Sequence, residues 1–227
     1  EDHDFVAAEH AFQQGPDAAK HKAFWLSRFA GGAPAMELPA DHVRPPVKTT
    51  RAARLDDVLD PSLEGDLRAL AKSLGASLAN VVFAAFQLYL GRLTGNQDVV
   101  IGLPSSGQLA HDLDGVVGHC VNFLPIKTTI APTQPFADFV RQSRGDLVAS
   151  LDHGNFTYGS LVRELRIHRD PSRVALVPVI FNVDNLTDIA GLRFAGLKSS
   201  FAMNPRGHEH FELFVNLLDE AGRVHLF

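Results

Sequence analysis

The sequence contains one cysteine among 227 residues. This excludes an internal disulfide framework and fits a reducing compartment, so we expect a cytoplasmic protein. No apolar run approaches the roughly 20 residues that a membrane-spanning helix needs, and we expect no membrane partner. The net charge of −5 offers no basic footprint for nucleic acid. The first ten residues are acidic and polar, unlike a signal peptide. The sequence contains neither of the two common glycine-rich phosphate-binding motifs, Gly-x-x-x-x-Gly-Lys and Gly-x-Gly-x-x-Gly.

The composition is that of a globular protein, with 45% hydrophobic and 21% charged residues. The length allows one large domain or two small ones. Apolar periodicity and end signals predict helices over 17–32, 60–75, 77–95, 135–151 and 157–167. Buried apolar runs predict a strand within 98–107 that runs into a Gly/Pro/Ser turn, and further strands over 119–130, 175–185, 210–219 and 223–227. Strands that alternate with helices predict an α/β fold, an α+β layered sandwich.

Local signals define the ends of the second predicted helix. Asp60 is a plausible N-cap, Pro61 takes the first helical position, and Gly75 closes the helix. The stretch from Val81 to Leu90 in the next helix is apolar almost all round, so we expect it to be deeply buried. The segment after residue 32 is rich in proline and predicts a surface linker. No first element is convincing before residue 17, and the chain stops on a strand, so we expect a piece of something larger.

Cys120 follows His119 directly, which raises the possibility of a Cys–His nucleophile. On a strand the two side chains would point to opposite faces, so they could not form a dyad with each other. A cysteine flanked by apolar residues is more often a small buried hydrophobe, and we favour that interpretation.

Two other patterns suggest chemistry but have simpler explanations. Ser105 lies in Gly-Leu-Pro-Ser-Ser-Gly, which is one residue too long for a nucleophile elbow, and a strand-ending turn is the better prediction. His208 and His210 would share a face on a strand, as the start of a zinc site would require. No third ligand is evident in the sequence, and we assign no metal site.

The stretch "HRDPSR" places two arginines and an aspartate at a Ser-Pro turn before a predicted strand. Arg169, Asp170 and Arg173 could pair with each other and with the turn backbone. We favour a salt-bridged structural turn over direct contact with a substrate.

Taken in order, "VGHCVNFLPIK", "HGNFTYGSLV" and "RDPSRVAL" resemble the fifth, sixth and seventh core motifs of condensation domains of nonribosomal peptide synthetases. "FW" at 24 and 25, followed by "ELPAD", is similar to the usual lead-in of the family. "VGHC" and "SSGQ" resemble most the condensation domains of hybrid polyketide–peptide synthetases. The resemblance begins near residue 5 and covers the C-terminal half of such a domain. It implies a chloramphenicol acetyltransferase-like fold of two similar halves around a tunnel.

The resemblance also implies an activity. Such domains form an amide bond between an acyl or peptidyl thioester and an aminoacyl acceptor, both held by phosphopantetheine arms of carrier proteins. The His-His-x-x-x-Asp-Gly catalytic motif of the family is absent here, and we expect it upstream. We therefore divide the chain into 1–46, a lead-in helix and linker from the N-terminal half, and 47–227, a C-terminal subdomain that is incomplete at its C-terminal end.

This half is expected to supply a tunnel wall, with no catalytic residue of its own and no directly bound cofactor. We expect Asn122, at a strand end, to line the tunnel or to fix a backbone turn. Further candidates for the tunnel or the cleft rim are Ser105, Ser106, His153 and Tyr158. The resemblance assigns a structural role to Gly118, Arg169, Asp170, Ser172 and Arg173.

The implied partners are the N-terminal half and the donor and acceptor carrier proteins. An alternative hypothesis is a non-catalytic module that docks a carrier protein through basic residues such as Lys20, Lys22 and Arg28. A third is an epimerisation or acyltransferase member of the same superfamily.

Overall fold

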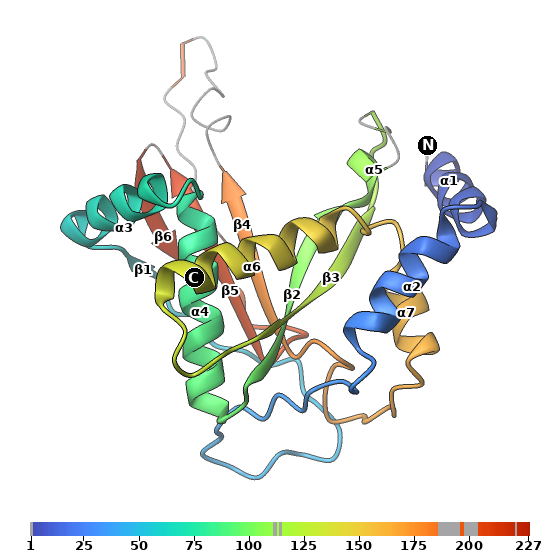
Figure 1. Cartoon of the computed structure of the whole chain (residues 1–227), viewed down its shortest axis with the longest axis horizontal. Helices are drawn as coiled ribbons and strands as arrows, with labels where there is room; N and C mark the ends of the chain where they lie inside the picture. The colour runs from blue at the N-terminus through green and yellow to red at the C-terminus, as the bar shows by residue number, and fades with distance from the viewer. Residues whose placement is uncertain (1, 111–112, 114, 186–195, 198–203, 221) are drawn as a thin grey trace.

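The computed structural model describes residues 2–110, 113, 115–185, 196–197, 204–220 and 222–227. Its helices are α1 (Asp2–Gln14), α2 (Ala18–Arg28), α3 (Pro61–Ser73), α4 (Leu78–Thr94), α5 (Gly107–Ala110), α6 (Phe136–Leu151) and α7 (Tyr158–Glu164). Its strands are β1 (Asp57–Val58), β2 (Asp98–Ser106), β3 (Val121–Thr129), β4 (Val179–Asn185), β5 (Leu213–Glu220) and β6 (Arg223–Leu226). Figure 1 shows their arrangement.

The six strands form one mixed sheet in the order β1-β6-β5-β4-β2-β3. β2 and β3 pair antiparallel along their whole lengths, whereas β4 runs parallel to both of its neighbours. β2 and β4 share only one residue pair, Gly102 with Ile180. Gly102 has no side chain, and a Cβ there would come within 2.4 Å of Ile180 Cδ1. The glycine therefore lets Ile180 pack at the centre of the sheet.

Side-chain caps begin helices α3 and α4 where the sequence predicts these helices to start. Asp60 Oδ1 accepts hydrogen bonds from the backbone N–H groups of Ser62 and Leu63, at 2.8 and 3.3 Å. Ser77 forms a capping box with Asn80. Gly75 follows the C-cap of α3 with a φ of +61°, which favours glycine. The predicted ends of these two helices are thus confirmed.

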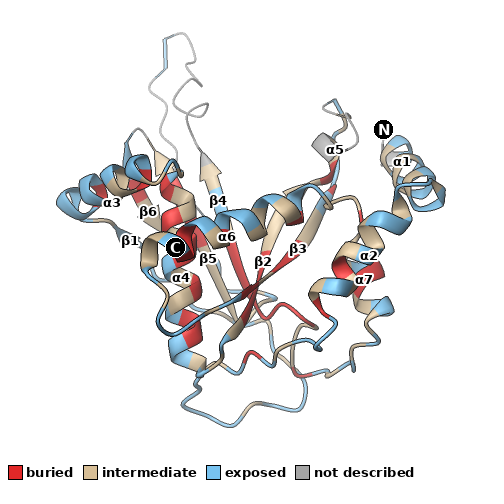
Figure 2. Cartoon of the chain, in the orientation of Figure 1, coloured by how far each residue is buried: buried red, intermediate tan, exposed pale blue. Residues whose placement is uncertain are grey.

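Helices α4 and α6 cover one face of the sheet, with α3 beside α4 (Figure 1). The buried residues follow the central strands and the inward side of α4 (Figure 2). Val81, Phe83 and Leu90 are buried, but Tyr89 is 56% exposed. The predicted deep burial of Val81–Leu90 thus holds for most of the stretch, with Ala85 and Tyr89 as the exposed positions.

A buried polar chain links four elements across this helical layer. Gln87 on α4 donates to Thr128 Oγ1 on β3 at 3.0 Å and accepts from Ser143 Oγ on α6 at 2.6 Å. Thr128 donates in turn to Asp146 on α6 at 3.0 Å. Arg28 on α2 donates to the other carboxylate oxygen of Asp146 at 2.6 Å. Because each buried polar group has a partner, the chain ties α2 to the sheet without an unpaired group.

Four elements differ from the sequence prediction, and two of them, α5 and β1, are short elements that were not predicted. The chain begins with helix α1, whose Phe12 contacts His21 of α2 at 4.9 Å between ring centroids. Strand β2 does not end in a turn at Pro104 but continues to Ser106. Gly107 N–H donates to Cys120 O, and the alternation of the ladder then turns the nitrogen of Pro104 away from β3. No ladder donor is lost there, so proline is tolerated.

No single helix in the described part of the chain is long and apolar enough to cross a membrane. Helices α3 and α4 reach that length and hydropathy only as a pair, which is bent by 102°.

Candidate functional site

Asn122 lies at the start of β3 and holds the loop that joins α6 to α7. Its Oδ1 accepts the backbone N–H of Tyr158 at 2.9 Å, and its Nδ2 donates to Gly154 O at 2.9 Å. A longer contact of 3.5 Å reaches Phe156 O. These bonds give Asn122 one of its two predicted roles, fixing a backbone turn. A tunnel-lining role stays a prediction.

Ser105 pairs directly with Asn122 across β2 and β3. The two side chains therefore lie on the same face of the sheet, whereas Ser106 points to the opposite face. Ser106 Oγ donates to Gln108 Oε1 at 3.3 Å, and Gln108 in turn donates to Val116 O. Gly118 lies at a bend in the loop before β3. The structure thus brings Ser105 and Asn122 together and places Ser106 in the support of this loop.

A cavity of about 290 Å³ lies between α1 and the start of β3, and Asn122 is in its wall. Cys120 is 5% exposed and precedes β3 rather than belonging to it. The prediction of a buried cysteine is confirmed. The remaining lining residues come mainly from α1 and from the loop after α6, and they are Phe5, Glu9, Gln13, Gly107, His119, Val121, Gly154, Asn155 and Thr157.

His153 packs beneath α2. Its ring stacks on Phe24 with centroids 3.9 Å apart and lies 4.9 Å from the ring of His21. Its backbone carbonyl accepts the indole N–H of Trp25 at 2.9 Å. Burial lowers the pKa of His21, which favours a neutral imidazole in this contact. His153 is thus part of the surface on which α2 packs, a role that the sequence did not predict.

Tyr158 is the first residue of α7, and its hydroxyl donates to Ala175 O. Its ring contacts Phe123 edge-on at 6.3 Å. Burial raises the pKa of this phenol to about 12, so it stays protonated at neutral pH. In this structure the side chain ties α7 to the segment before β4.

The turn that contains Asp170 is held by its own side chains, as the sequence suggested. Asp170 Oδ1 accepts the Ser172 N–H at 2.8 Å, and its second oxygen lies 3.4 Å from Arg173 Nε. Arg169 makes no ion pair within the described residues. The main partner of Arg173 is Glu37, which takes two hydrogen bonds of 2.6 and 3.0 Å. This partner lies in the proline-rich linker and was not predicted.

Removing the Glu37–Arg173 pair is expected to weaken the linker contact modestly. Arg173 hydrogen bonds lower the pKa of Glu37, so the pair stabilises the fold above the unfolded pKa and loses this effect as pH falls through the lower folded value. Because Glu37 is 61% exposed, we expect Arg173→Ala to cost only about 0.5–1 kcal/mol at pH 7. Urea denaturation at pH 7 and pH 3 measures this. Equal costs at both pH values would contradict it, and Arg141→Ala, which removes an exposed helix pair, is the control.

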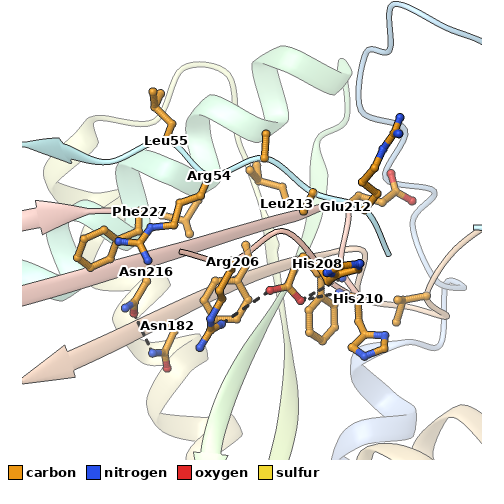
Figure 3. A pocket seen from close by; sticks show the side chains of 18 of the residues that line it. Arg54, Leu55, Asn182, Arg206, His208, His210, Glu212, Leu213, Asn216 and Phe227 are labelled. Carbon is orange, nitrogen blue, oxygen red and sulfur yellow. Dashed lines mark hydrogen bonds and ion pairs between the residues drawn. The ribbon is translucent and has the colours of Figure 1, made fainter. Parts of the chain in front are cut away.

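The largest cavity among those described, about 880 Å³, lies between β5, β6 and the linker (Figure 3). Arg44 in its wall forms two hydrogen bonds with Glu212, of 2.9 and 2.8 Å. His208 and His210 also line it, but no cluster of three or more possible metal ligands occurs in the described ranges. The sequence did not predict this cavity, because its walls come from distant parts of the chain. Arg44 and Glu212, for example, are 168 residues apart.

Comparison with known proteins identifies the family. The family model named Condensation domain matches residues 2–226. The chain belongs to the condensation domain family. Tyrocidine synthase 2 of Brevibacillus parabrevis is 32% identical to this condensation-domain chain over 183 residues, which is 81% of the chain and 5% of that protein. Bacitracin synthase 3 of Bacillus licheniformis is 26% identical over 225 residues, 97% of the chain and 4% of that protein.

Solved structures show the same fold. The condensation domain from the Monacolin K polyketide synthase MokA superposes with a TM-score of 0.81 at 19% identity, over 97% of this chain and 53% of that one. A four-domain nonribosomal peptide synthetase, holo-AB3403, gives 0.82 at 21% identity, over 92% and 17%. The predicted family and its chloramphenicol acetyltransferase-like fold are confirmed. The condensation-domain chain spans about half of the MokA domain structure and a small part of the curated relatives.

Proposed function

We propose that this chain is the C-terminal half of a condensation domain that forms an amide bond during nonribosomal peptide synthesis. The bond joins an acyl or peptidyl thioester to an aminoacyl acceptor. The observation that carries the proposal is the family match over residues 2–226, together with a span of 53% of the MokA domain. The sequence contains no pair of adjacent histidines, so in this proposal the His-His-x-x-x-Asp-Gly motif is supplied by the region upstream.

In this proposal the chain shapes the site and excludes water, and it supplies no proton-transfer group. Asn122 and Ser105 form the part of the wall at the paired tips of β2 and β3, since they face the same side of the sheet. A wall of this kind protects a thioester from hydrolysis while the amine attacks it. Phosphopantetheine arms on the donor and acceptor carrier proteins would present the two substrates, as partners rather than bound cofactors.

The proposed division at residue 46 separates a segment that belongs to the N-terminal half from the C-terminal subdomain, although the two parts pack against each other. Trp25 on α2 is 1% exposed and bonds to the loop after α6, so residues 1–46 are docked on the rest of the chain. The N-terminal half is the further partner that this proposal requires, and the cytoplasm is the compartment that it implies.

The decisive experiment combines loaded donor and acceptor carrier proteins with the enzyme and follows amide formation by intact-protein mass spectrometry. We expect product when the chain is joined to an N-terminal condensation half that carries the His-His motif. We expect no product from the chain alone.

Two controls make the outcomes distinct. Circular dichroism confirms that both proteins are folded, and alanine at the second histidine of the supplied motif is expected to abolish product. Product from the chain alone would overturn the half-domain proposal. Carrier binding without product from the joined protein would instead favour the non-catalytic docking module.

A further inference from the structure

Two histidine rings meet where α2 packs on the loop after α6. The ring centroids of His21 on α2 and His153 in this loop are 4.9 Å apart. Phenylalanine rings flank the pair, since Phe12 of α1 meets His21 edge-on at 4.9 Å and Phe24 stacks on His153 at 3.9 Å. Helix α2 is therefore held on the loop by a row of aromatic contacts that contains two titratable rings.

The surroundings of His21 suit a neutral ring. His153 Nδ1 has a partner in Ala149 O at 2.7 Å, whereas Nδ1 of His21 is buried and has no hydrogen-bond partner among the described residues. Protonation makes both ring nitrogens of a histidine donors. The cation would then place a charged N–H donor in a buried position without an acceptor, which costs free energy. The packing of α2 on the loop therefore opposes protonation of His21.

The charges around His21 act mostly in the same direction. Burial is the main cause that lowers the pKa of His21, and a hydrogen bond with the backbone of His153 raises it. The charges of His153 and Lys20 lower the pKa further, and that of Asp17 raises it. Because Asp17 is exposed, water screens its charge, and a protonated His21 gains little from it.

Carboxylates on the other helices packed against α2 are paired with other cations. Glu164 of α7 lies 2.8 Å from Lys22, and Asp146 of α6 lies 2.6 Å from Arg28. Helices α1, α2 and α7 lie together at one side of the molecule (Figure 1). The other charged or histidine side chains described on α1, on α7 and in the loop are mostly exposed, namely His3, Asp4, Glu9, His10, Asp152 and Arg163. Neutralisation of a protonated His21 by these groups is therefore weak.

The same loop carries part of the candidate site. Asn122 holds its backbone by bonds to Gly154 O and to the N–H of Tyr158, both at 2.9 Å. Trp25 on α2 donates to His153 O at 2.9 Å. A change in the contact between α2 and His153 therefore acts on the loop that Asn122 fixes.

We propose that the contact between His21 and His153 is a pH-sensitive switch, which holds α2 on the loop after α6 while His21 is neutral and releases α2 when His21 is protonated. Release lets water accept the hydrogen bond of Nδ1. Because the docked state disfavours the proton, docking is strongest above the ordinary pKa of 6.5 and weakens as pH falls below it, toward the lower pKa of the docked state. The inference goes beyond the proposed function and does not depend on it.

NMR on the unmodified chain between about pH 5 and pH 8 tests the switch. The ring signals of His21 give its pKa, and we expect a value below 6.5. Amide hydrogen exchange, corrected for the intrinsic effect of pH, gives the opening equilibrium of α2 in the same samples. We expect this equilibrium to rise as pH falls, by up to about tenfold for each unit by which the measured pKa is lowered.

Variants and an internal reference identify the cause. Amides of α4 report global unfolding, and we expect the opening of α2 to rise by a larger factor than theirs. His21→Phe keeps an aromatic ring that binds no proton, so α2 is expected to lose this additional pH dependence. His21→Gln, a neutral polar replacement, is expected to have the same effect. His10→Phe makes the same change at an exposed site on α1 and is expected to keep the pH dependence.

Three results would overturn the proposal. The first is a pKa of 6.5 or above for His21 in the folded chain. The second is an equal rise in the opening of α2 and α4, which would mean that acid unfolds the whole chain. The third is an unchanged pH dependence in both His21→Phe and His21→Gln, which would assign the release of α2 to other groups.

Discussion

Replacing Asn122 by alanine is expected to lower the free energy of unfolding by about 2–3 kcal/mol. The substitution leaves the Tyr158 N–H and the Gly154 carbonyl without the partners that hold them at 2.9 Å. Both bonds are partly buried, so water replaces them only in part. Urea denaturation followed by circular dichroism measures the change.

Asn96→Ala is the matched control. It deletes the same amide, but the main bond of the half-buried Asn96, at 2.8 Å to Ala35 O, is exposed to water, so a loss below about 1 kcal/mol is expected. Asn122→Asp keeps the acceptor for Tyr158 and loses the donor, and an intermediate loss is expected. If Asn122→Ala costs no more than Asn96→Ala, the loop does not depend on Asn122. In the joined enzyme, a change in KM or kcat beyond that of an equally destabilised variant would support the tunnel-lining role.

Trp25→Ala is expected to have the largest effect on stability, a loss of about 3–5 kcal/mol. Trp25 is 1% exposed, and its removal opens a cavity beneath α2 and breaks the bond to His153 O. Arg28, one turn further along α2, would still pair with Asp146. The same denaturation experiment measures the loss, and limited trypsin digestion after Lys20 and Lys22 reports whether α2 detaches.

Two further variants define the cause. Trp25→Phe keeps most of the packing and loses the indole N–H, so about 1 kcal/mol is expected. Tyr89→Ala removes an aromatic ring that is 56% exposed, and a much smaller loss than for Trp25→Ala is expected. Equal losses for Trp25→Ala and Tyr89→Ala would show that α2 is not anchored by Trp25.

Local signals explain why much of the fold was predictable from the sequence. Asp60, Ser77 and Gly75 act through neighbours within a few residues, and the structure confirms each of them. Buried apolar runs likewise identified the long strands. The continuation of β2 through Ser105 was missed because it depends on pairing with β3, and a Pro-Ser-Ser sequence resembles a turn when its partner strand is unknown.

The candidate site was less predictable, because its contacts connect distant parts of the chain. Glu37 and Arg173 are 136 residues apart, and no local pattern pairs them. Asn122 could be singled out from its motif, but its bonds to the loop near Tyr158 required the structure. His153 stays a candidate for the cleft rim, and the structure adds a packing contact that the sequence did not indicate, the stacking of its ring on Phe24. The chemical character of one side chain predicts its role poorly where the role depends on packing against residues far away in the sequence.

Because β2 and β4 share a single residue pair, the sheet consists of two parts that are joined by few backbone contacts, β2 with β3 and β4 with β5. The backbone ladder couples β2 only to β3 over most of its length, and β4 only to β5. The C-terminal ends of β2 and β4 diverge, as Figure 1 shows. A rotation of the paired strands β2 and β3 about the Gly102–Ile180 contact would therefore move Ser105 and Asn122 together relative to β4, because the β2–β3 ladder joins them.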